Sequence, residues 1–179
     1  MILNEDEVQR LVSLAQEGDQ DAFGQLYDIF SQRIYNFLFG RVRHKETAED
    51  LLHTIFLKAW ANLDKYKQRV NVKFSTWLFQ IANYTLIDYW RTRKETVELE
   101  KIDNLVRFSN STEFEDYQFL TTALSSLPLD YQTVLELRFK QDLSVAETAK
   151  IMKKSEVGIR VLQHRAIKLL RKALDKLKI

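Results

Sequence analysis

The sequence predicts an all-α protein, and three observations support this class. Its 179 residues include only one proline and four glycines, whereas Leu, Glu, Lys, Gln and Ala, which favour helices, are abundant. No Asn-Gly or Asp-Gly pair separates two strand-like runs, as a β-hairpin would require. Hydrophobic residues make up 45% of the chain, which is enough for helices to bury real cores.

Charge divides the chain into three parts. Residues 1–94 carry 13 basic and 12 acidic side chains, residues 95–118 carry 2 and 7, and residues 119–179 carry 12 and 6. The acidic stretch is also rich in Ser, Asn and Thr. We therefore expect two small helical domains, residues 1–94 and 117–179, joined by a flexible acidic linker, residues 95–116.

The N-terminal domain is expected to form helices near Glu5–Glu17, Asp19–Arg43, Thr47–Tyr66 and Lys73–Lys94. Gly18 suits the position after the first helix, and Asp19 can cap the second. Thr47 and Asp50 have the spacing of a capping box, which predicts that the third helix begins there.

The C-terminal domain is expected to form helices at Glu115–Ser126, Pro128–Lys140, Ser144–Met152 and Ser155–Lys176. Pro128 fits a first helical position, Ser144 and Glu147 have capping-box spacing, and Ser155 can cap the last helix. A short capped helix followed across a tight turn by a longer one is a helix-turn-helix. The second helix of that motif enters the major groove of DNA.

The last predicted helix carries no acidic residue between Glu156 and Asp175. At 100° per residue its basic side chains share one face, and Leu162, Ala166 and Leu169 fall on the opposite, core-forming face. A solvated basic face is the alternative, but such faces usually mix signs. The pattern favours a DNA-binding face that includes Arg160, Val161, His164, Arg165 and Lys168. On it Val161 can contact a thymine methyl, and Ser155 at the helix start can meet a phosphate.

Two N-terminal helices also carry candidate surfaces. In "AEDLLHTIFLKAW" (Ala48–Trp60) the face opposite the core stripe holds apolar and acidic groups, which either pack under a neighbouring helix or dock a partner protein. Its members are Asp50, His53, Leu57 and Trp60. The helix Lys73–Lys94 is rich in aromatic residues and apolar almost all round, so it is either sandwiched in a bundle or a stacking platform for unpaired bases. On its wheel Asn83 and Trp90 point outward, and Tyr84 is intermediate.

Several function classes are disfavoured. The chain has no cysteine and only three histidines, at 44, 53 and 164, and it lacks a glycine-rich phosphate loop, so we expect no enzyme, metal site or cofactor. "MILNEDEVQR" is acidic where a signal peptide would be basic, and no apolar run reaches the roughly 18 residues of a membrane span. We expect a cytoplasmic protein without membrane insertion.

Three stretches in this order resemble the extracytoplasmic function (ECF) sigma factors of bacterial RNA polymerase. "AEDLLHTIFLKAW" is similar to their core-enzyme-binding helix, and "FSTWLFQIANYTLIDYWRTRK" to their promoter-melting and −10-reading helix. "LSSLPLDYQTVLELRFKQDLSVAETAKIMKKSEVGIRVLQHRAIKLLRKAL" is similar to their −35-binding domain. The resemblance covers nearly the whole chain. It implies a sigma factor that binds core polymerase and directs promoter-specific transcription initiation through −10 melting and −35 recognition.

The resemblance also implies partners and site residues. Asp50, His53 and Leu57 would dock the largest polymerase subunit, and an anti-sigma factor is an expected partner. The chain departs from the family pattern at His53, usually Gln, at Tyr84, where the pattern places Asn, and at Val161-Leu162, often Ser-Arg. The −10 contacts would come from Asn83, Tyr84, Trp90 and Arg91. A conventional dimeric helix-turn-helix regulator and a helical adaptor without a DNA role are the alternatives.

Overall fold

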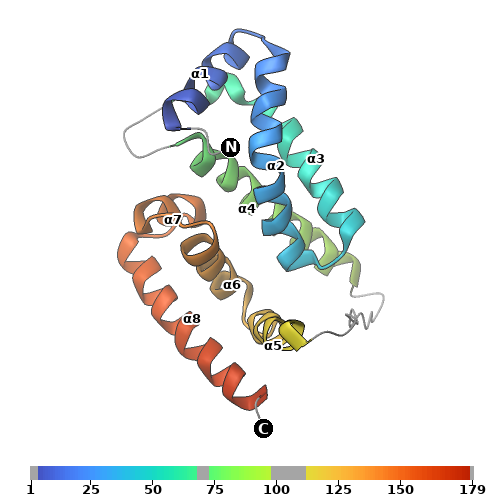
Figure 1. Ribbon diagram of the computed structural model, residues 1–179, viewed down its shortest axis with the longest axis vertical. Helices are drawn as coiled ribbons and strands as arrows, with labels where there is room; N and C mark the ends of the chain where they lie inside the picture. Colours follow the sequence, from blue (N-terminus) through green and yellow to red (C-terminus); the bar gives the residue numbers. More distant parts are fainter. Residues whose placement is uncertain (1–3, 68–72, 98–111, 178–179) are drawn as a thin grey trace. The chain divides into compact units, whose positions relative to one another are not determined.

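The computed structural model describes residues 4–67, 73–97 and 112–177, and across these ranges the chain forms helices and no strand (Figure 1). The expected all-α class is therefore confirmed. The chain divides into two compact units, residues 1–102 and 103–179. Most of the expected linker, residues 98–111, lies outside the described residues. Its ends are helical, because α4 reaches Val97 and α5 begins at Thr112.

The first unit contains α1 to α4 (Figure 1), with α2 and α3 as neighbours, α4 packed against both, and α1 packed against α2 and α4. A short 3₁₀ turn, η1, follows α3. The bounds are α1 Glu5–Gln16, α2 Gln20–Val42, α3 Lys45–Ala61, η1 Leu63–Lys65 and α4 Phe74–Val97.

Local sequence signals fix most of the helix ends in this unit. Gly18 has a φ of 100° directly after α1, a left-handed conformation that glycine adopts without strain. The Asp19 carboxylate accepts the backbone N–H of Ala22 at 3.0 Å and caps α2. The predicted start of the third helix was wrong. Nδ1 of His44 accepts the N–H of Thr47 at 3.3 Å, so α3 begins at Lys45 and Thr47 lies inside it.

Aromatic and aliphatic side chains from all four helices build the core of the first unit. Phe37 of α2 and Phe79 of α4 are fully buried, and their rings meet edge to face at a centroid distance of 5.4 Å. Buried residues from the helices include Val12, Leu26, Ile34, Leu38, Ile55, Leu78 and Leu86. Since contacts reach α4 from several sides, every residue from Phe74 to Leu86 is buried or half-buried, and the helix becomes exposed only from Ile87 onward.

Tyr66 closes the end of this core near η1. It is buried, and its ring lies 5.6 Å from that of Phe74 and 5.3 Å from that of Trp77. The side-chain amide of Gln16 donates to the carbonyls of Leu63 and Tyr66, both at 2.8 Å, and so ties the end of α1 to η1. Burial, with the Glu5 carboxylate as a smaller cause, raises the pKa of Tyr66 to about 12.

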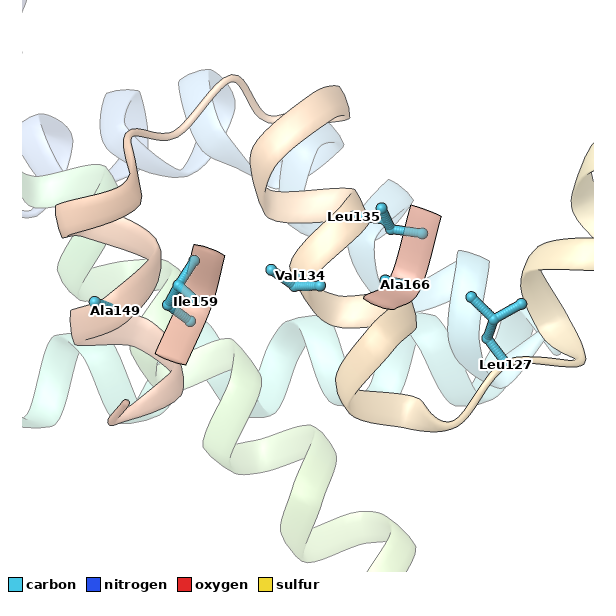
Figure 2. Close-up of a cluster of buried hydrophobic side chains, with 6 residues drawn as sticks. All are labelled: Leu127, Val134, Leu135, Ala149, Ile159 and Ala166. Carbon is cyan, nitrogen blue, oxygen red and sulfur yellow. The ribbon is translucent and has the colours of Figure 1, made fainter. Parts of the chain in front are cut away.

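The second unit packs α8 against α5, α6 and α7 (Figure 1). Figure 2 shows its core, where side chains of α6, α7, α8 and the loop before α6 gather. The buried members are Leu127, Val134, Leu135, Ala149, Ile159 and Ala166. The bounds are α5 Thr112–Ser125, α6 Leu129–Leu135, the π-helical turn η2 Glu136–Lys140, α7 Val145–Met152 and α8 Glu156–Leu177.

Three local expectations for this unit were wrong. Pro128 is the residue before α6 and not its first helical residue. The segment Glu136–Lys140 is π-helical and does not continue the α-helix. Leu169, expected on the core face of the last helix, is 40% exposed, so the buried stripe of α8 is narrower than the wheel predicts.

Candidate nucleic-acid and partner interfaces

The predicted helix-turn-helix is formed by α7 and α8. Ser144 and Glu147 make the expected capping box: the Ser144 hydroxyl accepts the Glu147 N–H at 3.1 Å, and the Glu147 carboxylate accepts the Ser144 N–H at 2.8 Å. Two backbone groups at the start of α7 are thereby satisfied, which stabilises a helix of only eight residues.

The turn between these helices is equally well defined. Lys153 ends α7 in the left-handed region with a φ of 49°, and the N–H of Lys154 donates to the Ala149 carbonyl at 3.0 Å. The Ser155 hydroxyl then accepts the N–H of Gly158 at 3.1 Å and caps α8, as predicted. Together these bonds fix where α8 begins.

The outward face of α8 is basic, as the wheel predicts. Ile159 and Ala166 are fully buried, so the opposite side of the helix is fixed toward the core. Arg160 forms an ion pair with Glu156 at 3.5 Å, and both side chains are more than half exposed. Such an exposed ion pair contributes little to stability, so the guanidinium stays available for other contacts. The predicted site residues Arg160, Val161, His164, Arg165 and Lys168 are all exposed, as are Arg171 and Lys172.

Sequence reasoning missed one member of this face. Val157 is 67% exposed in the first turn of α8 and is four residues before Val161, which is 45% exposed. The same wheel places Val157 between His164 and Lys168, so the periodicity contained the signal. The face is therefore basic but includes two exposed valines near the start of the helix.

The candidate partner surface on α3 is exposed as predicted. Asp50, His53 and Leu57 lie outside the core, and Leu57 is 69% exposed although its neighbours Ile55 and Phe56 are buried. Trp60 is 38% exposed, and its ring rests on that of Phe23 at 4.8 Å. Burial under a neighbouring helix, the alternative reading, does not apply to Leu57.

 A groove between α2 and α3, with a volume of about 370 Å³, adjoins this surface. His53 lies at its rim, so the α3 surface and this groove are continuous. The lining residues are Tyr27, Ser31, Gln32, Tyr35, Glu49, Leu52 and His53.

The residues predicted to contact −10 DNA lie on α4 but differ in exposure. Asn83, expected to point outward, is buried with 6% of its surface exposed, because α1, α2 and α3 all pack against α4. Tyr84 and Trp90 are half-buried. Arg91 is exposed and pairs with Asp88 at 3.1 Å. The structure therefore leaves Arg91 exposed and Tyr84 and Trp90 partly accessible, and it removes Asn83 from the surface.

A small aromatic and cationic cluster forms near the end of α4. The Trp90 ring lies 5.2 Å from that of Tyr89, and the Arg93 guanidinium lies 5.8 Å from the first ring and 5.9 Å from the second. Arg93 also donates to the Tyr89 hydroxyl at 2.6 Å. Its role as the group that holds both rings was not predicted.

Two features of the described part of the chain concern metal binding and membrane insertion. Within it, His, Asp and Glu side chains form no cluster of three or more that could hold a metal ion. None of its helices is long and apolar enough to cross a membrane.

Comparison with known proteins adds family matches in both units. Residues 26–96 match the model of Sigma-70 region 2, and residues 123–178 match that of Sigma-70, region 4. The chain is 36% identical over 171 residues to the ECF RNA polymerase sigma factor BldN of Streptomyces coelicolor, covering 92% of this chain and 64% of BldN. It is 31% identical over 170 residues to the ECF RNA polymerase sigma factor SigX of Bacillus subtilis, covering 89% of this chain and 87% of SigX.

A solved structure shares the fold. The sigma factor RpoE of Bartonella quintana, crystallised with the anti-sigma factor NepR, aligns with a TM-score of 0.74 at 22% identity and covers 86% of this chain and 96% of that one. At this identity the likeness concerns the fold alone.

Proposed function

The chain belongs to the extracytoplasmic function RNA polymerase sigma factors, and we propose that its two units divide the work of promoter recognition. It binds core RNA polymerase and directs promoter-specific transcription initiation. Residues 1–94 bind the polymerase and melt the −10 region. Residues 117–179 bind the −35 element, and residues 95–116 link the two.

The exposed face of α8 is the observation that carries the −35 assignment. Its cations stand opposite the fully buried Ile159 and Ala166, on the second helix of a capped helix-turn-helix. Arg160, Val161, His164 and Arg165, in the N-terminal half of the helix, read base edges in the major groove. Lys168 and the cations beyond it contact phosphates and hold the helix in register. The start of α8, capped by Ser155, adds free N–H groups toward a phosphate.

The first unit supplies the other contacts. The surface formed by Asp50, His53, Leu57 and Trp60 binds the largest polymerase subunit, since exposed apolar groups beside a carboxylate are suited to a protein partner. Trp90 and Arg91 hold unpaired −10 bases by stacking and charge. Asn83 acts from inside the unit, as a support for α4.

Partners and location follow from this function. RpoE of Bartonella quintana was solved with an anti-sigma factor, and we include a protein of that class among the partners of this chain. Its work on promoter DNA places it in the cytoplasm. It acts without a cofactor and is not itself an enzyme, because the polymerase carries the chemistry of RNA synthesis.

In vitro transcription tests the proposal. Sigma-free bacterial core polymerase with the purified chain should yield transcripts from selected promoters, and the chain alone should bind the same DNA weakly. Tight binding of palindromic DNA by a dimer of the isolated chain, without transcripts, would instead establish the conventional helix-turn-helix regulator.

A further inference from the structure

We propose that Val157 and Val161 form a reading pair on α8 that recognises the 5-methyl groups of two neighbouring thymines in the −35 element. The inference rests on the proposed function, because it requires that α8 enter the major groove. The inference goes beyond the proposed function by naming the chemical feature that two positions of the promoter must carry.

The two side chains are neighbours on an exposed surface. They are 67% and 45% exposed and separated by four residues, which places their Cβ atoms about 5–6 Å apart on a helix. Stacked base pairs are separated by about 3.4 Å along the duplex. Each valine can therefore face a different base pair.

Their surroundings argue against accidental exposure. Arg160, His164 and Arg165 are exposed on the same face, so two apolar residues interrupt an otherwise polar and cationic surface. Valine also has a lower helix propensity than Lys, Arg, Glu or Gln, which are common on exposed helix faces. DNA matches this arrangement, because negatively charged phosphates flank a major groove that can present apolar groups. The thymine methyl is the apolar group that the major groove presents.

The start of α8 gives the pair a fixed position. Ser155 caps the helix through the N–H of Gly158, and a Cβ added at Gly158 would lie 3.1 Å from the Ser155 hydroxyl. Glycine therefore leaves room for the cap. Ile159, fully buried between the two valines in sequence, holds the helix in one rotational setting. Valine is also stiff at χ1, so little side-chain freedom is lost on contact.

Removing single methyl groups from the DNA provides the test. A −35 element is first selected by the holoenzyme from a randomised library, and each thymine is then replaced by uracil. The intact protein should lose about fourfold in affinity at two neighbouring positions, as expected for one buried methyl group. Val157→Ala should abolish the loss at one position, and Val161→Ala at the other. Leu169→Ala, a truncation elsewhere on α8, should retain both.

The outcomes distinguish failure of this inference from failure of the proposed function. A holoenzyme that ignores the −35 sequence would overturn the proposed function. A sequence-specific holoenzyme whose selected element lacks two neighbouring thymines, or that binds uracil and thymine equally, overturns the reading pair alone. So does uracil sensitivity that persists in both alanine variants. Val157→Ser, which leaves no methyl group at this exposed position, should lower uracil sensitivity without loss of folding.

Discussion

Arg138, in the π-helical turn after α6, donates from Nε to the Gln163 side-chain oxygen on α8 at 3.1 Å. A terminal nitrogen of the same guanidinium donates to the carbonyl of Leu143, next to the cap of α7. One side chain therefore joins the π-helical turn, the loop before α7 and the recognition helix. The five donors of a guanidinium suit such a junction.

Arg138→Met should destabilise the second unit by about 1–3 kcal/mol, because the partners lose charge-assisted hydrogen bonds. Lys140→Met is the matched control: Lys140 is half exposed and pairs with Glu136 at 3.5 Å. Gln141 also donates to that carboxylate, so loss of the lysine should cost under about 1 kcal/mol. Urea unfolding of the full chain, with hydrogen exchange of α8 amides, measures both. Equal protection of α8 in the two variants would show that Arg138 does not hold the junction.

Lys153→Gly should stabilise the second unit by about 1 kcal/mol, since a non-glycine residue in the left-handed region is strained and Lys153 has a φ of 49°. Lys153→Ala removes the same charge but keeps the Cβ, so it should give no such gain. Thermal unfolding compares the two. A Gly variant no more stable than the Ala variant would contradict the strain argument.

Helix positions were predictable where a short polar cap marks them. Asp19, Ser144 and Ser155 all cap the expected helices, since their side chains reach a backbone N–H two or three residues on. His44 is an unusual cap, so the start of α3 was predicted two residues late. The π-helical turn has no comparable sequence signal and depends on the packing around it.

Site residues were predictable where a helix has one buried side. This holds for α8, where the wheel separates Arg160 from Ile159, and for α3, where it separates Leu57 from Ile55. It fails for α4, which other helices contact on several sides, so Asn83 is buried despite its position on the wheel. A wheel describes one helix and contains no information on how many neighbours surround it.

Leu57→Ala combined with Asp50→Ala should retain the helical circular dichroism signal and lose polymerase in a pull-down, because truncating an interface hot spot costs about 2 kcal/mol or more. Ile87→Ala, which truncates an exposed apolar residue of α4, is the control and should bind normally. Undiminished binding by the double variant would remove the α3 surface from the polymerase interface.

Trp90→Ala combined with Arg91→Ala should impair transcription from duplex promoters, and a pre-melted template should restore it, since stacking and charge then need not offset base unpairing. Asn83→Ala should behave differently. It perturbs a buried polar group, so it should lower thermal stability by about 1–3 kcal/mol. Failure of the pre-melted template to rescue the first variant would rule out a melting role.

The central claim is that the outward face of α8 reads sequence at its start and binds only phosphates further along. Arg160→Ala and Lys172→Ala, both at exposed positions, test it when measured as holoenzymes on a −35 promoter library at two salt concentrations. Arg160→Ala should lose about 1–3 kcal/mol and relax preference at one base position. Lys172→Ala should weaken all sequences alike and lower the salt slope by roughly 1. If the two variants give the same sequence profile, α8 presents only a solvated basic face and the account of −35 recognition is wrong.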